Sequence, residues 1–193
     1  MITFKDFGPK IVEILKKGGV GVVPTDTIYG ISASALDKKA VERVYSLKGK
    51  AEQKPMIVLI SSPKDLDILD VRLNTVAKKF LKTYWPGRVS VILDCLAKKY
   101  EYLHRGTKTL AFRVPAYPDL ISLLKKTGPL VSTSANPGGK EPAGNIAQAK
   151  KYFGEKMDFY VDIGDLGSTP STVARIYENG NVEIIREGSV KIK

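Results

Sequence analysis

The sequence predicts an α/β fold built on an open sheet of mixed strand direction. Short apolar runs that are typical of buried strands alternate with segments whose apolar residues recur at helical spacing. The last third of the chain departs from this alternation, because two strand-like runs there flank Glu-Asn-Gly-Asn at 178–181, a turn sequence. The 193 residues match the size of one domain and hold no linker or internal repeat, so we expect a single domain over residues 1–193.

Elements of the first half follow from apolar spacing and stop signals. The first helix carries Ile11 and Leu15 on one face and ends at the glycines 18 and 19. Asp37 is predicted to cap a second helix, which leads into a lysine-rich loop at 48–54. A third helix around 76–84 is ended by Trp85-Pro86-Gly87. The strands predicted in this half lie at 20–25, 56–60 and 89–93.

The second half continues the same alternation before it changes. Helices are predicted at 117–126 and 145–154, between and after strands at 109–114 and 129–136. The final strands, 172–177 and 182–187, are predicted to form an antiparallel hairpin with a tight type I′ turn, which an Asn-Gly pair favours.

The charge balance indicates an anionic partner. Lys plus Arg number 31 and Asp plus Glu number 20, which gives a net charge of +11. Such a surface attracts nucleotides, nucleic acid or anionic lipid, although lysine enrichment also serves solubility or heat tolerance. The 43% apolar content with 26% charged residues is that of a globular protein and excludes a disordered chain.

Several site classes are excluded by the rare residues. The single cysteine, Cys95, forms no disulfide within the chain and is expected to be a buried structural thiol, and the single histidine, His104, excludes histidine-pair metal sites. Neither a P-loop nor a Gly-x-Gly-x-x-Gly motif occurs, so we predict no protein metal site and no P-loop nucleotide site. A signal peptide and a long apolar span are also absent, which favours a cytoplasmic protein with no membrane partner.

Three polar segments follow predicted strands, where open α/β sheets place their ligands. The first, Pro-Thr-Asp-Thr-Ile-Tyr-Gly at 24–30, is either a ligand-binding loop or a helix start with Asp26 or Thr27 as its cap and Tyr29 in the core. The second carries Lys48, Lys50 and Lys54, which either converge on phosphates or form a solvated basic loop.

The third polar segment, Val-Ser-Thr-Ser-Ala-Asn-Pro-Gly-Gly at 131–139, ends a strand in hydroxyls and an amide. These side chains either cap the next helix or bind phosphate and ribose oxygens. Two arginines, Arg113 and Arg186, lie within predicted strands, where each must either extend to solvent or face a ligand.

Six motifs in this order resemble one family. They are PTDTIYG, the KGK loop, PGRVSVIL, AFRVP, STSAN, and the late STVARI with IIREGS, and together they resemble the threonylcarbamoyl-AMP synthase family, also called YrdC or TsaC, over residues 18 to 189. The resemblance implies an open twisted α/β sheet with a basic concave ligand cavity. It implies the single-domain form, and a nucleotidyltransferase that joins L-threonine, bicarbonate and ATP into threonylcarbamoyl-AMP and pyrophosphate.

The resemblance also assigns site residues. The family's Lys-x-Arg element falls on Lys48 and Lys50 and its Ser-x-Asn element on Ser134 and Asn136, so these four are the expected catalytic residues. The implied ligand contacts form two sets: for ATP, Lys50, Lys54, Thr109, Ser134, Asn136 and Arg186, and for threonine, Thr27, Arg113 and Ser171. Magnesium is expected on the ATP phosphates.

The chain departs from the family pattern at two positions. Lysine replaces the arginine at Lys50, which keeps the charge but loses the planar fork that grips phosphate. Leu59 stands where some relatives carry a histidine near the amino acid.

The implied partners are proteins that transfer the threonylcarbamoyl group to tRNA, together with tRNA or double-stranded RNA itself. Two alternatives stay open. One is a paralogue that has changed or lost the reaction, and the other is an RNA-binding module without this activity, whose affinity would fall steeply with salt.

Overall fold

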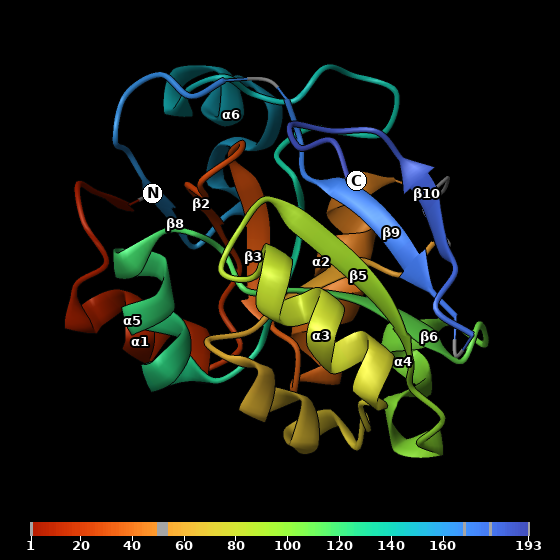
Figure 1. The fold of residues 1–193 in the computed structure, drawn as a ribbon. Helices are drawn as coiled ribbons and strands as arrows, with labels where there is room; N and C mark the ends of the chain where they lie inside the picture. Colours follow the sequence, from red (N-terminus) through yellow and green to blue (C-terminus); the bar gives the residue numbers. More distant parts are fainter. Residues whose placement is uncertain (1, 50–53, 168, 178, 193) are drawn as a thin grey trace.

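The computed structural model describes residues 2–49, 54–167, 169–177 and 179–192, and it confirms the α/β fold (Figure 1). The strands are β1 (Ile2–Phe4), β2 (Gly21–Val23), β3 (Gly30–Ser34), β4 (Ile57–Leu59), β5 (Val89–Asp94), β6 (Thr109–Arg113), β7 (Leu130–Ser134), β8 (Phe159–Val161), β9 (Thr172–Ile176) and β10 (Val182–Arg186). The α-helices are α1 (Pro9–Lys16), α2 (Lys38–Lys48), α3 (Thr75–Tyr84), α4 (Glu101–His104), α5 (Pro118–Thr127) and α6 (Ile146–Phe153). Three short 3-10 helices are η1 (Pro63–Leu69), η2 (Lys98–Tyr100) and η3 (Gly154–Lys156).

The described strands form one sheet in the order β1-β8-β2-β3-β7-β4-β6-β5-β9-β10. Its direction is mixed, as predicted: β4 pairs parallel with β6 and β5 with β9, whereas β3 and β4 both pair antiparallel with β7. The hairpin of β9 and β10 is antiparallel and closes one edge of the sheet. Strands distant in sequence are therefore neighbours in the centre, where β7 separates β3 from β4.

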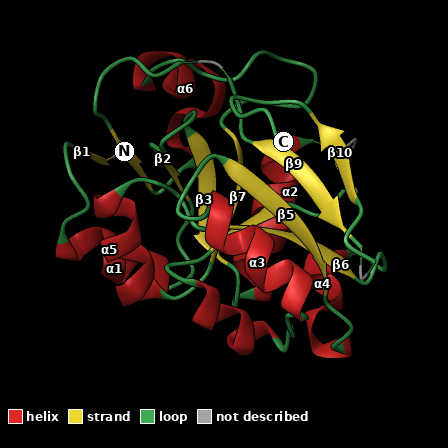
Figure 2. Ribbon diagram, viewed as in Figure 1, coloured by secondary structure: helices red, strands yellow, loops and turns green. Residues whose placement is uncertain are grey.

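Two apolar clusters cover the two faces of the sheet. Successive residues of β4 join different clusters, Val58 the larger one and Leu59 the smaller one, as the period of two in a strand requires. Helices α1 and α5 lie side by side over the smaller cluster (Figure 2). The larger cluster packs beneath α2, α3 and α6. The smaller cluster leaves part of its face open, and that part becomes the cavity described below.

The local signals gave the positions of five helices correctly, and the four-residue helix α4 was not predicted. The Asp37 carboxylate accepts hydrogen bonds from the backbone N–H groups of Lys39 and Ala40 at 2.9 and 3.1 Å, so it caps α2 as predicted. Cys95 is buried, and burial raises the pKa of its thiol, which is the expected behaviour of a structural cysteine. No helix within the described ranges is both long and apolar enough to cross a lipid bilayer.

The structure rules out one alternative for residues 24–30, adds a strand that was not predicted, and corrects the predicted hairpin turn. Residues 24–29 start no helix: they are the loop between antiparallel β2 and β3, although Tyr29 is buried as that alternative held. The strand β3 itself was missed because Gly-Ile-Ser-Ala-Ser has few of the β-branched and aromatic residues that mark strands. The hairpin turn is not type I′, because the paired residues are Tyr177 and Asn181, and Gly180, with φ 90°, donates to the Tyr177 carbonyl. The loop is therefore one residue longer, a form that places glycine in the left-handed region.

Candidate functional site

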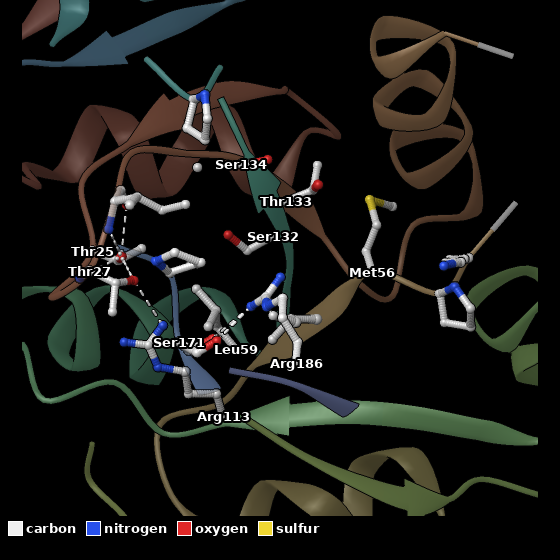
Figure 3. Close-up of a pocket in the computed structure, with 17 residues that line it drawn as sticks. Thr25, Thr27, Met56, Leu59, Arg113, Ser132, Thr133, Ser134, Ser171 and Arg186 are labelled. Atoms are coloured by element: carbon white, nitrogen blue, oxygen red, sulfur yellow. Dashed lines mark hydrogen bonds between the residues drawn. The ribbon is translucent and has the colours of Figure 1, made fainter. Parts of the chain in front are cut away.

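A cavity of about 350 Å³ opens on the sheet face that α1 and α5 leave uncovered (Figure 3). Its floor consists of directly paired residues on adjacent strands: Gly30 faces Ser134 across β3 and β7, and Ile57 faces Ser132 across β4 and β7. Because directly opposed residues point to the same face of a sheet, these four positions form one floor. The walls come from the β2–β3 loop, the end of β6 and the β9–β10 hairpin.

The lining is cationic and rich in hydroxyl groups. Its charged residues within the described part of the chain are Lys54, Arg113 and Arg186, and no carboxylate joins them. The hydroxyl-bearing residues that line it are Thr25, Thr27, Ser132, Thr133, Ser134 and Ser171. These cations and hydroxyl donors suit the binding of anionic groups.

Arg113, at the carboxyl end of β6, fixes the loop between β2 and β3. Its Nη2 pairs with the Asp26 carboxylate, its Nη1 donates to Thr27 Oγ1 at 3.1 Å and its Nε donates to the Gly87 carbonyl at 2.9 Å. The Arg113 and Asp26 side chains are only 4% and 6% exposed. Burial lowers the pKa of Arg113 in spite of the Asp26 charge beside it.

Thr25 stiffens the same loop from within. Its Oγ1 accepts from the backbone N–H groups of Thr27 and Ile28 and donates to the Ile28 carbonyl at 2.8 Å. It also lies 2.9 Å from Thr27 Oγ1. The Thr27 hydroxyl is therefore held between Thr25 and Arg113 at the edge of the cavity.

The two elements predicted to be catalytic meet in space, although 86 to 88 residues separate them. Lys48 is the last residue of α2, and its Nζ donates to Asn136 Oδ1 at 2.9 Å and to the Ser134 carbonyl at 3.0 Å. Ser134 Oγ in turn donates to Asn136 Oδ1 at 2.5 Å. Only Ser134 of these three lines the cavity, so Lys48 and Asn136 support it from behind.

This cluster decides two alternatives left open by the sequence. Ser134 and Asn136 do not cap the next helix, because α6 is capped by Asn145, whose side chain accepts from Gln148 N–H at 2.9 Å. Lys48 is no solvated loop residue, since it is 3% exposed. Lys54 is exposed and lines the cavity, whereas Lys50 lies outside the described residues.

Arg186 reaches the cavity from the edge strand because of a β-bulge. The register of β10 against β9 shifts between Ile184 and Arg186, so Ile184 faces Ala174 and Arg186 faces Val173. In a regular strand Arg186, two residues after Ile184, would share its face, but the extra residue Ile185 places Arg186 opposite Val173, the residue next to Ala174. The bulge therefore turns the guanidinium to the opposite face.

The charge of Arg186 is not neutralised by any described residue. Its Nη2 donates to the carbonyl and the hydroxyl of Ser171, at 2.7 and 3.3 Å, and both acceptors are uncharged. Ser171 is itself held by Ser90, with 2.9 Å between their hydroxyl oxygens. Partial desolvation, and then the charge of the nearby Arg113, lower the pKa of Arg186, which lies on an exposed edge strand. A bound anion would relieve this repulsion between two guanidinium groups.

One predicted site residue lies elsewhere. Thr109 begins β6, four residues before Arg113, which places it about 13 Å along the strand from the cavity end. Its hydroxyl donates to Thr107 Oγ1, and it does not line the cavity. Leu59 lies in the apolar part of the lining.

Sequence reasoning missed the roles of Thr25, Asp26 and Ser132. Thr25 and Asp26 belong to a segment that the sequence did single out, but their partners come from β6, so no local pattern shows the contact. Ser132 lies two residues before Ser134, and strand alternation could have placed both on one face.

A mixed sheet whose cavity combines hydroxyl groups with uncompensated cations defines an α/β domain suited to phosphate and carboxylate ligands. Residues 13–188 match the model of the Sua5/YciO/YrdC family, which is described as telomere recombination, and the chain belongs to this family.

Two named relatives are similar to this chain over most of its length. A putative threonylcarbamoyl-AMP synthase of Methanocaldococcus jannaschii is 34% identical over 95% of this chain and 88% of its own length. A threonylcarbamoyl-AMP synthase of Marinobacter nauticus is 34% identical over 82% of this chain and 85% of its own.

Solved structures agree on the fold. Sua5 of Pyrococcus abyssi in complex with L-threonine superimposes with a TM-score of 0.87 at 26% identity, and this chain spans 57% of that longer protein. YciO of Escherichia coli superimposes with a TM-score of 0.86 at 27% identity, and the match covers 97% of it.

Proposed function

We propose that this chain is an L-threonylcarbamoyladenylate synthase, a nucleotidyltransferase that forms threonylcarbamoyl-AMP and pyrophosphate from L-threonine, bicarbonate and ATP. The relatives of that name support the proposal, and so does the likeness to a Sua5 that binds L-threonine. The observation that carries it is the cationic, hydroxyl-rich lining of the cavity, in which no described residue neutralises Arg186, since such a lining suits anionic ligands.

The reaction needs no nucleophile from the protein. The threonine amine condenses with bicarbonate to a carbamate with loss of water. A carbamate oxygen then attacks the α-phosphorus of ATP, the bond from that phosphorus to the bridging oxygen breaks, and pyrophosphate leaves with the electron pair. The protein positions the substrates and neutralises charge, and alignment in a closed site contributes about 7 to 11 kcal/mol.

The loop beside Arg113 is the proposed threonine side of the cavity. Thr27, whose hydroxyl is held in place by Thr25 and Arg113, orients threonine or its carbamate. Ser171 offers a hydroxyl on the same side. Each of the three guanidinium nitrogens of Arg113 bonds to the protein, so its main role is to hold this loop in position.

The opposite side is proposed to hold the nucleotide. Ser134 contacts it, with Lys48 and Asn136 fixing the Ser134 side chain. Arg186 and Lys54 neutralise the phosphates, and Lys50 is proposed to join them.

Magnesium is proposed to arrive with ATP. Among the described residues no group of three or more aspartate, glutamate, histidine or cysteine side chains could hold a metal ion. Asp26, in the loop that forms one wall of the cavity, is engaged by Arg113 and by the backbone N–H of Ala116 at 3.0 Å. The residues therefore fit an ion that is held by phosphate oxygens and water, where it would neutralise the leaving pyrophosphate.

The product is a mixed anhydride of a carbamate and AMP, and a second protein must consume it. We propose a tRNA threonylcarbamoyl-transferase protein as this partner. The net charge of +11 is compatible with tRNA or double-stranded RNA close to the chain.

Release of pyrophosphate tests the proposal. The purified protein is given ATP and magnesium, threonine and bicarbonate are omitted in turn, and mass spectrometry follows the adenylate. Release that needs both co-substrates, together with the adenylate, supports the proposal. Folded protein that binds ATP without releasing pyrophosphate would point to a paralogue with changed chemistry, and salt-sensitive RNA binding alone would point to an RNA-binding module.

A further inference from the structure

Gly30, the first residue of β3, lies between the two proposed halves of the cavity. Thr27, on the threonine side, is three residues earlier in the chain. Ser134, on the nucleotide side, is the residue of β7 that pairs directly with Gly30. Gly30 itself lines the cavity. A side chain at this position would share the face of Ser134 and point into the space between the halves.

Glycine is required at this position for space and not for backbone conformation. Unlike Gly49, with φ 87°, Gly30 has no positive φ, so its backbone accepts any L-residue. A Cβ atom at Gly30 would lie 2.6 Å from Ser132 Oγ and 3.2 Å from the Thr133 carbonyl oxygen. Both distances are shorter than normal contacts, so the methyl group of an alanine would displace Ser132 or protrude further into the cavity.

The floor beside Gly30 also holds polar groups without partners. Ser32 Oγ, two residues further along β3, is buried and has no hydrogen-bond partner among the described residues. Ser132, the residue of β7 that pairs with Ser32, lines the cavity. The Ser132 Oγ makes no hydrogen bond to a described residue. A bound ligand over Gly30 would meet the Ser132 hydroxyl.

Building on the function proposed above, we propose that the absent side chain of Gly30 provides the space in which the two substrates meet. The carbamate oxygen approaches from the Thr27 side and the α-phosphorus from the Ser134 side. The new oxygen–phosphorus bond forms over Gly30, while the bond from that phosphorus to pyrophosphate breaks. The missing side chain of Gly30 thus allows both substrates to be bound at the same time, whereas either substrate bound alone does not need this space.

The test is the variant Gly30→Ala, measured for single and joint binding and for turnover. We expect ATP alone and threonine alone to bind within about 3-fold of the original protein. We expect kcat for the adenylate to fall about 100-fold, which is the cost of a misplacement near 1 Å. Gly144→Ala is the matched control, because Gly144 lies outside the cavity, has no positive φ, and its Cβ would meet nothing closer than 3.7 Å.

A double variant distinguishes loss of the space over Gly30 from a clash between the new methyl group and Ser132. Gly30→Ala with Ser132→Ala removes the hydroxyl that the new methyl group would strike, and Ser132→Ala alone is its reference. If the clearance serves the substrates, the double variant stays about 100-fold below this reference. Recovery to the level of Ser132→Ala would overturn the proposal, and so would an unimpaired kcat in Gly30→Ala.

Failure of the proposed function gives a different result. The original protein would then release no pyrophosphate that depends on threonine and bicarbonate. In that case the proposal about Gly30 is tested by whether ATP and threonine bind at the same time. ATP is titrated with and without saturating threonine, and the proposal survives only if the original protein binds both together while Gly30→Ala binds one at a time.

Discussion

The buried ion pair between Asp26 and Arg113 makes the most specific prediction about this fold. Asp26→Asn keeps the size of the side chain but removes the only carboxylate that pairs with Arg113 among the described residues. The guanidinium would then stay buried, with an uncompensated charge, near Arg186. Removing one partner of a buried pair costs about 3 to 5 kcal/mol, because the other charge is left desolvated.

The magnitude follows from the exposure of the pair. Side chains that are 4% and 6% exposed are screened little by water, so the free-energy cost for a buried ion pair applies and not the smaller cost for a surface pair. For a domain of this size, 1 kcal/mol corresponds to about 2 to 4 °C in Tm. Asp26→Asn is therefore expected to lower Tm by roughly 10 °C, with a matching shift of the midpoint in urea.

The matched control is Asp70→Asn, which breaks the pair with Lys99. There the side chains are 50% and 61% exposed, and asparagine accepts the left-handed backbone of Asp70, φ 56°. The expected cost is below about 1 kcal/mol. Equal costs for the two variants would refute the reasoning. So would full additivity of Asp26→Asn with Arg113→Gln, because paired charges must show a coupling energy.

Three further predictions concern the site and the alkaline stability. Lys48→Ala is expected to remove pyrophosphate release while circular dichroism stays unchanged, because Ser134 loses the group that orients it; turnover at the original rate would contradict the assignment. Arg186→Ala removes a lining cation whose charge no described residue neutralises, so ATP affinity should fall; an unchanged Kd by calorimetry would contradict this. Burial raises the pKa of Tyr160 to about 12, so the folded state holds this proton more tightly than the unfolded state; its contribution to stability is complete below pH 10 and is lost as the pH rises toward 12. Tyr160→Phe should therefore flatten the fall of Tm over that range, and a parallel curve would disprove this origin.

The sequence was informative wherever a signal acts over a few residues. The Asp37 cap depends on backbone groups two and three residues away, so it is visible in the chain alone. The apolar faces of α1 and α5 follow from helical spacing in the same way. Most strands were placed because apolar runs between stop signals are short. The strand β3 was not predicted because its glycine, serine and alanine residues, some of which form the cavity floor, are not typical of strands.

The site was predictable in composition but not in arrangement. Motif resemblance brought Thr27, Ser134, Ser171 and Arg186 forward, and the fold does gather them around one cavity. It also brought forward Thr109, which lies at the other end of β6, because a motif gives no direction along a strand.

The sequence by itself determined the elements, the charge and the chemical types that the site contains. Tertiary structure decided which of these groups meet. Strand order brings Lys48 to Asn136 across 88 residues, and the pairing of β4 with β6 brings Arg113 to the loop of Asp26. The register shift at Ile185 then decides the face of Arg186. The physical reason is that caps and periodicity act over one or two turns of backbone, whereas strand order and register arise from burial of the whole sheet.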